Sequence, residues 1–258
     1  MIKGKYELSN ILKKYNLQQF YKDLQKLHIT LSDVQAEQFL IYYEMLIEKN
    51  HVVNLTAITD FNEIIKKHFI DSLSLVKAYD FSHNDTEISL IDIGTGAGFP
   101  GIPLKIVFPD LKITLMDSLN KRVDFLNEVI DTLGLNQIDV IHGRAEDYAK
   151  PGKLREKYDL CVSRAVANLS VLAEYCLPYV KVGGKFISYK SEKVTEEIND
   201  AEYAIDILGG KIEEQVIFTL PDSDMYRNLV VIEKVSETLS KYPRKAGKVD
   251  KKPLHCDI

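Results

Sequence analysis

Cysteine is scarce in this chain, and long apolar runs are missing from it. The 258 residues include three cysteines, Cys161, Cys176 and Cys256, and no two of them have the CxxC spacing. This odd number argues against a disulfide framework and a zinc site, and it fits a reducing compartment. No apolar run approaches the roughly 20 residues that cross a bilayer, and residues 1–7 lack the apolar stretch of a secretory signal. We therefore expect a cytoplasmic globular protein with no membrane and no metal partner.

The chain also has no excess of basic residues. It carries 33 Lys and Arg against 38 Asp and Glu, a formal net charge of −5, which does not indicate a nucleic-acid binder. The exception is the stretch 241–252, where six cationic side chains accompany one acid, Asp250. Such a stretch can contact phosphates, or it can be a solvated terminus. Charge alone favours the solvated terminus.

The N-terminal part of the sequence has helical periodicity. Apolar side chains recur at helical spacing over 39–47, and Ser32 with Gln35 has the form of a capping box that opens this helix. A second helix is predicted over 64–77. The polar, turn-like residues 81–86 mark a boundary, so we predict a helical N-terminal extension over 1–84.

From residue 87 onward, short apolar strands alternate with helices. Strands are predicted at 88–93, 113–116, 138–141, 159–163 and 185–189, and helices at 101–108, 121–133, 170–180 and 195–208. The helix over 170–180 is expected to end at Gly183-Gly184. Two further strands, 216–218 and 228–232, have no helix between them and therefore predict an antiparallel hairpin. The alternation predicts a doubly wound, mostly parallel α/β domain over 85–235, followed by a basic tail over 236–258.

Glycines cluster between the first strand and the first helix of this sheet. Gly94, Gly96 and Gly98 follow Asp92, at the edge of the sheet where doubly wound proteins bind ligands. Glycine lets the backbone approach a ligand closely. Asp117 ends the next strand, where a carboxylate can accept hydrogen bonds from both hydroxyls of a ribose. We therefore expect a nucleotide-type cofactor at this loop.

Two cofactors fit the loop. Residues 96–101 match GxGxxG literally, which leaves an NAD-dependent oxidoreductase as an alternative. Asp92 and Gly94 extend the match to DxGxGxG, the usual form in methyltransferases, and an acid near the loop suits the cationic amino-acid end of S-adenosylmethionine. The final strands without a crossover helix favour the same interpretation. We therefore predict a methyltransferase that uses S-adenosylmethionine, ahead of the dehydrogenase and of a purely structural glycine turn.

The sequence lacks the devices that two classes of methyl acceptor require. The motif for exocyclic amines, (Asp/Asn/Ser)-Pro-Pro-(Tyr/Phe), is replaced by Ser163-Arg164-Ala165-Val166. Methylation of pyrimidine C5 needs a nucleophilic cysteine, whereas Cys161 and Cys176 have the pattern of buried structural thiols. Guanine N7 needs neither device because it has no proton to lose, so that positioning and electrostatics suffice. The residues are consistent with N7 but do not single it out.

These motifs together resemble a known family, the bacterial small-subunit rRNA guanine-N7 methyltransferases, once called glucose-inhibited division protein B. The resemblance runs from about residue 35 to the C-terminus. Its markers are Asn54-Leu55-Thr56, His68 with Asp71-Ser72, DIGTGAGFPGIP at 92–103, DSLNKR at 117–122, Arg144-Ala145-Glu146, Ser163-Arg164-Ala165 and YPRKAG at 242–247. The glycine motif combined with DSLxKR is highly specific, and the weaker markers occur in the right order.

The resemblance implies a fold, a reaction and a partner. The fold is the Rossmann-like one of class I methyltransferases. The reaction is methylation of N7 of a guanine in the 530 loop of 16S rRNA, at the guanine 527 position in standard rRNA numbering. The partner is 16S rRNA, the small ribosomal subunit or its assembly intermediate. If the basic tail contacts this RNA, removing 241–258 is expected to weaken RNA binding and to leave cofactor affinity intact. A non-catalytic ribosome-assembly module that binds RNA through this tail is a further alternative.

The resemblance also assigns site residues by position. It places cofactor contacts on Gly94 and Phe99 of the loop, on Asp117 for the ribose, on Ala145 and Glu146 for the adenine, and on Arg164 for the methionine end or the target base. The glycine motif itself adds Asp92, Gly96 and Gly98 as cofactor-binding candidates. Arg164, Lys190, His68 and Asp71 are the catalytic candidates. The family usually has glycine after the lysine, but Ser191 stands here.

Each assignment has a structural alternative. Asp117 can cap the following helix, and Arg164 can be an ordinary ion-paired arginine. His68 and Asp71, one helical turn apart, can share a helix-surface hydrogen bond. Lys190 can be a solvated lysine.

Overall fold

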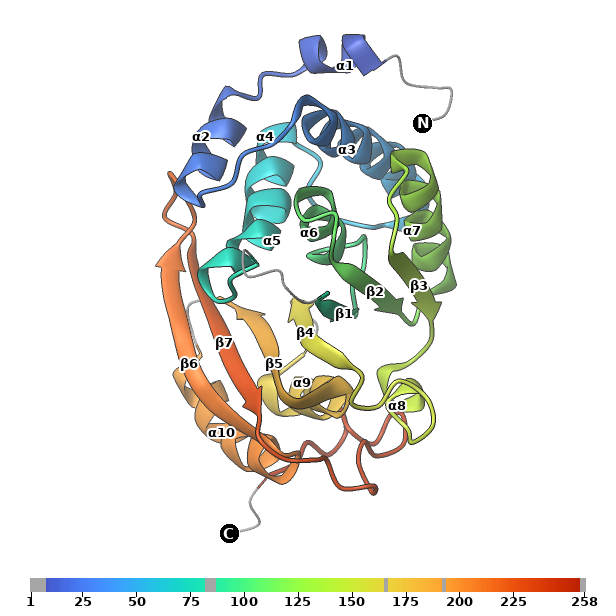
Figure 1. Cartoon of the computed structure of the whole chain (residues 1–258), viewed down its shortest axis with the longest axis vertical. Coiled ribbons are helices and arrows are strands. Elements are labelled where there is room, and N and C mark those ends of the chain that lie inside the picture. Colours follow the sequence, from blue (N-terminus) through green and yellow to red (C-terminus); the bar gives the residue numbers. More distant parts are fainter. Residues whose placement is uncertain (1–7, 82–86, 165–166, 192–193, 256–258) are drawn as a thin grey trace.

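A seven-stranded sheet forms the centre of the protein in the computed structural model, which describes residues 8–81, 87–164, 167–191 and 194–255. Its strand order is β3-β2-β1-β4-β5-β7-β6 (Figure 1). Strands β1 to β5 pair in parallel, whereas β7 lies antiparallel to both β5 and β6. The predicted doubly wound, mostly parallel sheet with an antiparallel final hairpin is therefore confirmed.

The bounds of the elements follow the predicted alternation closely. The strands are β1 (Ser89–Ile93), β2 (Lys112–Asp117), β3 (Ile138–His142), β4 (Tyr158–Arg164), β5 (Val180–Lys190), β6 (Gly210–Thr219) and β7 (Tyr226–Lys234). The helices are α1 (Leu8–Lys14), α2 (Gln18–Lys26), α3 (Asp33–Val53), α4 (Phe61–Ile64), α5 (Asp71–Leu73), α6 (Gly101–Val107), α7 (Asn120–Leu133), α8 (Ala145–Tyr148), α9 (Leu169–Cys176) and α10 (Thr195–Ile207). A π-helical segment, Ile65–Ile70, and 3₁₀ segments, Ser74–Lys77 and Leu177–Tyr179, complete the list.

Two strand starts differ from the prediction. Gly183 and Gly184 lie inside β5 and do not end the preceding helix, which stops at Cys176 and continues as a 3₁₀ turn. A Cβ at Gly184 would lie 2.6 Å from the backbone oxygen of Asp159, so glycine there permits close approach of β4. Strand β6 begins at Gly210, well before the predicted 216, because its exposed charged side chains weaken the apolar signal.

Helices cover both faces of the sheet. One apolar core joins the N-terminal helices, α6 and α7 to the sheet, and a second core lies between the opposite face and α8, α9 and α10 (Figure 1). Strand β1 is buried on both faces, as expected of a central parallel strand. The carboxyl ends of the parallel strands consequently meet the loops at one edge.

The N-terminal helices pack onto the sheet as an integral layer. Ser32 and Gln35 form the predicted capping box of α3, and the helix predicted over 64–77 is part of a continuous helical stretch from Phe61 to Lys77. Residues 1–7 and 82–86 lie outside the described residues, and with them most of the boundary predicted at 81–86. The division at residue 84 therefore stays a prediction.

The residues after β7 pack against the domain. Tyr242 and Val249 are buried, and the side chain of Arg244 pairs with Glu174 of α9. The lysines of 241–252 are exposed, as the charge-based expectation of a solvated terminus has it, but apolar side chains and the pair of Arg244 with Glu174 attach this part of the tail to the domain. Residues 256–258, with Cys256, lie outside the described residues. Among the helices of the described ranges, none has the length and apolar character needed to cross a membrane.

Candidate active site

The glycine loop turns from β1 into α6 with three residues in the left-handed region. Gly94, Gly96 and Gly98 have φ values of 71°, 63° and 106°. A Cβ at Gly98 would lie 2.5 Å from Cδ1 of Ile102, so both conformation and space require glycine there. From α3, the hydroxyl of the buried Tyr42 donates a hydrogen bond to the backbone oxygen of Ala97 at 2.5 Å. The N-terminal layer thus supports the loop from behind.

Asp92 holds the loop from beneath and does not line the cavity in front of it. Its Oδ2 accepts hydrogen bonds from the Thr95 hydroxyl at 2.7 Å and from the backbone N–H of Gly101 at 2.9 Å. Oδ1 is buried without a partner among the described residues. Complete burial raises the pKa of this carboxyl to about 6. In this structure Asp92 positions the loop, and its buried side chain does not reach the cavity where a contact with the cofactor was predicted.

Asp117 ends β2 at the mouth of the loop. Its Oδ2 accepts a hydrogen bond from the backbone N–H of Gly96 at 2.9 Å, and its Oδ1 accepts one from the backbone N–H of Leu119 at 2.9 Å. Arg122 lies 3.3 Å from Oδ2. Asp117 therefore does help to organise the start of α7, as the structural alternative expected, and it also lines the cavity.

A cavity of about 520 Å³ opens beyond the ends of β1, β2 and β4. Predicted residues that line it are Gly94, Gly96, Phe99, Asp117, Ala145, Glu146, Arg164 and His68. Gly98 and Asp92 do not line it. The volume lies in the range of small-molecule sites, and the lining combines loop backbone, apolar surface and carboxylates.

Three flat side chains stack at one end of this cavity. The rings of His68 and Phe99 lie 4.6 Å apart at 19°, and the guanidinium of Arg164 lies 5.1 Å from the centre of the Phe99 ring. The Nη2 of Arg164 lies 3.4 Å from Nδ1 of His68. The other ring nitrogen of His68, Nε2, lies 2.8 Å from the hydroxyl of Thr56. A guanidinium can only donate, so Nδ1 accepts and Nε2 carries the hydrogen.

His68 is an uncharged imidazole in this stack. Burial, followed by the positive charge of Arg164, lowers its pKa to about 4. The ring is therefore neutral at physiological pH. It can support and orient Arg164, but it does not add a cation to the site.

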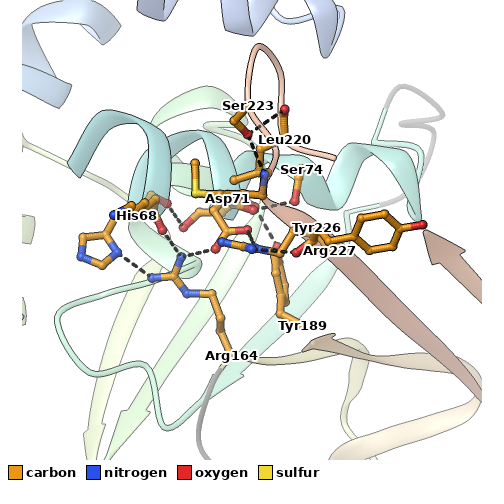
Figure 2. A network of polar contacts seen from close by, with 12 residues as sticks. His68, Asp71, Ser74, Arg164, Tyr189, Leu220, Ser223, Tyr226 and Arg227 are labelled. Atoms are coloured by element: carbon orange, nitrogen blue, oxygen red, sulfur yellow. Dashed lines mark hydrogen bonds and ion pairs between the residues drawn. The ribbon is translucent and has the colours of Figure 1, made fainter. Parts of the chain in front are cut away.

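Asp71 connects two arginines from distant strands (Figure 2). Its Oδ2 accepts a hydrogen bond from Arg164 of β4 at 3.1 Å, and its Oδ1 accepts one from Arg227 of β7 at 2.7 Å. The carboxylate is 7% exposed. The predicted pair of His68 and Asp71 is thus not a helix-surface hydrogen bond. Both side chains point to Arg164, from a π-helical segment and the helix that follows it.

A second cavity of about 510 Å³ lies on the other side of Arg164 and His68, which line both cavities. Asp71, Lys190 and Arg227 belong to this second cavity. Lys190 is not a solvated lysine, because its ammonium lies 2.6 Å from Oε1 of Glu197 and 2.8 Å from the backbone oxygen of Ala167. Ser191, at the departure from the family pattern, also lines this cavity.

The structure brings the predicted residues together and adds others. Arg227, Glu197 and Asp250 line the cavities, and no motif in the sequence pointed to them. Asp250 was visible only as the single acid in a basic stretch. Ala165, in the marker Ser163-Arg164-Ala165, lies outside the described residues. Within the described ranges, no group of three or more His, Cys, Asp or Glu side chains is placed to hold a metal ion.

Comparisons with known proteins agree with one another. The family model of rRNA small subunit methyltransferase G matches residues 35–230. Proteins named ribosomal RNA small subunit methyltransferase G are similar over nearly their whole length. One from Lachnoclostridium phytofermentans is 59% identical over 91% of this chain and 96% of its own, and one from Alkaliphilus oremlandii is 49% identical over 96% and 99%.

Solved structures with low sequence identity share the fold. A mutant of MtNAS covers 89% of this chain and 86% of its own at 17% identity, with a TM-score of 0.51. The complex of the Haloferax volcanii Trm112 methyltransferase activator with a methyltransferase contains a chain that covers 68% and 93% at 15% identity, with a TM-score of 0.50. At these identities the likeness concerns the fold alone.

The sheet order and the glycine-loop cavity define a Rossmann-like methyltransferase of class I, the class that uses S-adenosylmethionine. The family model, which matches most of the sequence, narrows the class of methyltransferase to one family. This chain belongs to the rRNA small subunit methyltransferase G family. Membership of this family decides against the NAD-dependent oxidoreductase and against a purely structural glycine turn.

The residues of the first cavity fit S-adenosylmethionine. A Cβ at Gly96 would meet no atom within 4 Å, so the loop leaves open space where a ligand approaches the backbone. Asp117 presents a carboxylate at the end of β2, the position from which a ribose is held. Phe99 and Ala145 supply apolar surface, and Glu146 supplies a further acceptor.

Proposed function

We propose that this protein transfers a methyl group from S-adenosylmethionine to N7 of a guanine in the 530 loop of 16S rRNA, at the guanine 527 position. The names of its relatives support RNA of the small ribosomal subunit as the substrate. The structural observation that carries the proposal is the junction of the two cavities at Arg164 and His68. A cofactor in the first cavity and a base in the second would meet there. We propose that the protein acts in the cytoplasm, where ribosomes assemble.

The charges of the second cavity suit a nucleotide. Four cationic side chains line it, Lys67, Arg164, Lys190 and Arg227, against two carboxylates, Asp71 and Glu197. The net positive charge favours a phosphate-bearing ligand over a neutral one. Since Asp71 is held by two arginines and Glu197 by Lys190, the charged groups are fixed before the substrate arrives.

The reaction at N7 needs orientation more than proton transfer. S-adenosylmethionine supplies an electrophilic methyl group on a sulfonium centre. The lone pair of N7 would form the new bond to the methyl carbon as the carbon–sulfur bond breaks, S-adenosylhomocysteine would leave with that bonding pair, and no proton would leave the base. On the protein side, the Arg164 guanidinium is fixed by Asp71, by the backbone oxygen of Lys67 and by the Phe99 ring, so it presents a rigid surface at the junction of the two cavities.

The carboxylates of the second cavity suit the product of this step. Methylation at N7 leaves a positive charge on the guanine ring. Asp71 and Glu197 line the cavity in which that charge would develop, and they offset part of the positive charge of the four cationic side chains, which lowers the repulsion that the product would meet. We further propose that Asp117 holds the cofactor ribose and that Ala145 and Glu146 flank its adenine.

An acceptor without N7 provides the direct test. Small subunits would be reconstituted with 16S rRNA that carries either guanosine or 7-deazaguanosine at the target position, and transfer of a labelled methyl group would be measured. The guanosine RNA is expected to accept one methyl group, and the 7-deaza RNA none. Equal labelling of both RNAs would exclude N7. A deletion strain that keeps full N7 methylation in its 530 loop would exclude this protein as the enzyme.

The same assay separates enzyme from assembly module. Turnover of the labelled cofactor on small subunits is expected if the protein is catalytic. Binding of subunits without turnover would favour the non-catalytic module. Comparing naked 16S rRNA, assembling particles and mature subunits as acceptors will show which form of the RNA the protein uses.

A further inference from the structure

The C-terminal segment, residues 242–252, is held in place by arginine contacts. Arg155 donates from Nη1 to the backbone oxygen of Tyr242 at 2.8 Å. The Nε and Nη2 atoms of Arg244 lie 2.9 and 2.6 Å from the two carboxylate oxygens of Glu174, and its backbone N–H donates to Oε1 at 2.7 Å. Glu174 is fully buried. Bidentate pairing of this kind fixes both position and orientation.

The same segment reaches the first cavity. Val249 is buried completely, and its neighbour Asp250 lines the cavity together with Tyr175 and Glu146. Burial raises the pKa of the Tyr175 phenol, and the neighbouring carboxylate of Asp250 adds to this rise, so the two side chains lie close together in the cavity lining. Figure 1 shows the segment in red, running from β7 past α9 towards α8. The C-terminal segment therefore supplies a wall of the cofactor site.

The wall is rich in hydrogen-bond acceptors. Burial raises the pKa of Glu146, and the negative charge of Asp250 adds to this rise, so the two carboxylates lie close enough to interact. Neighbouring carboxylates are best satisfied by a ligand that donates N–H groups. In S-adenosylmethionine, the exocyclic amine of the adenine offers two such donors. The ribose would lie at Asp117, at the end of a different strand.

We propose that Asp250 completes the adenine end of the cofactor site and accepts a hydrogen bond from the exocyclic amine. The C-terminal segment thus selects adenine over bases that carry an oxygen at this position. This role depends on the cofactor alone and not on which RNA atom receives the methyl group. It also argues against the expectation that the tail can be removed with cofactor affinity intact.

Calorimetry with two cofactor products tests the proposal. S-adenosylhomocysteine carries the amine, whereas S-inosylhomocysteine carries an oxygen in its place. Wild-type protein is expected to bind the adenosyl compound more tightly. Asp250→Ala should weaken binding of the adenosyl compound by about 10-fold, the usual size of a lost hydrogen bond to a charged group. Binding of the inosyl compound should weaken less, because the oxygen that replaces the amine has no proton to donate.

Asp250→Asn provides a sharper variant. Its amide can donate to the oxygen of S-inosylhomocysteine, so affinity for this compound should rise above that of the wild type. Asp200→Asn on α10 makes the same chemical change at an exposed residue outside both cavities and should alter neither affinity. Asp250 is itself exposed, so the variants are expected to fold, and thermal unfolding verifies this.

Two results would overturn the proposal. The first is unchanged binding of both compounds by Asp250→Ala, which would mean that the side chain does not touch the cofactor. The second is an equal loss for both compounds, which would mean that the segment closes the cavity without reading the base. A deletion of the segment is less informative, because it also leaves the buried Glu174 without Arg244.

Discussion

Replacing His68 by glutamine is expected to change how the stability of the protein depends on pH. The imidazole has a pKa of about 4 in the folded protein, against an ordinary value of 6.5. Because the folded pKa is the lower one, His68 contributes stability above pH 6.5 that is lost as the pH falls from 6.5 through 4. At about 1.4 kcal/mol per pH unit, the loss amounts to roughly 3 kcal/mol.

Glutamine suits this experiment because it does not titrate, yet its amide can reach the Thr56 hydroxyl that pairs with Nε2 of His68. The free energy of unfolding in urea would be measured for both proteins between about pH 7.5 and 4. The wild type is expected to lose roughly 3 kcal/mol relative to the variant over this range. In parallel, the NMR signal of the His68 ring should stay at its neutral position at about pH 5.5.

The comparison of two proteins is essential because Asp92 titrates in the opposite sense. Its folded pKa of about 6 exceeds the usual 3.8, so its contribution to stability is full below pH 3.8 and is lost as the pH rises through 6. In the wild type the two effects partly cancel. A difference between wild type and His68→Gln that stays flat from pH 6.5 to 4 would refute the placement of a neutral imidazole against Arg164.

Three further substitutions test the loop and the network. Gly98→Ala places a Cβ 2.5 Å from Ile102 at a φ of 106°, so S-adenosylhomocysteine binding should weaken at least about 10-fold in calorimetry, and normal affinity would contradict the strained geometry. Tyr42→Phe leaves the oxygen of Ala97 unpaired and should lower the free energy of unfolding in urea by about 1–3 kcal/mol, whereas no change would mean that the bond contributes nothing. Asp71→Asn leaves two arginines without their counter-charge and should cost about 3–5 kcal/mol of stability and most of the methyl transfer. S-adenosylhomocysteine affinity should stay unchanged, because Asp71 does not line the first cavity; loss of that affinity instead would mean that Arg164, which lines both cavities, needs Asp71 to hold the cofactor.

Local patterns predicted the sheet and the loop well. The alternation of apolar strands with capped helices, and glycines at the end of β1, depend on neighbours within a few residues, and these signals are present in one sequence. The residues at which strands begin were harder to predict. The first half of β6 faces solvent with charged side chains, and the glycines in β5 serve close approach to β4, which no local pattern distinguishes from the end of a helix.

Long-range partners were not predictable in this way. The resemblance pointed to His68, Asp71 and Arg164, but not to the contact of Asp71 with Arg227, which lies 156 positions further along the chain. Tyr42 supports the loop across 55 positions. Such pairs depend on how the helices pack on the sheet, and the hydrophobic periodicity of the sequence does not predict that packing. Charge counting failed at Asp250 for the same reason, since it treats a folded segment as a solvated one.

The placement of Asp250 has a practical consequence for anyone who expresses this protein. The wall that it forms is synthesised after every other part of the cavity that fits the cofactor. A nascent chain that extends only as far as β7 has its glycine loop but not this wall. An affinity tag or fluorescent protein fused after residue 258 would begin nine positions along the chain from Asp250, which lines the cavity. Fusions for binding studies therefore belong at the N-terminus.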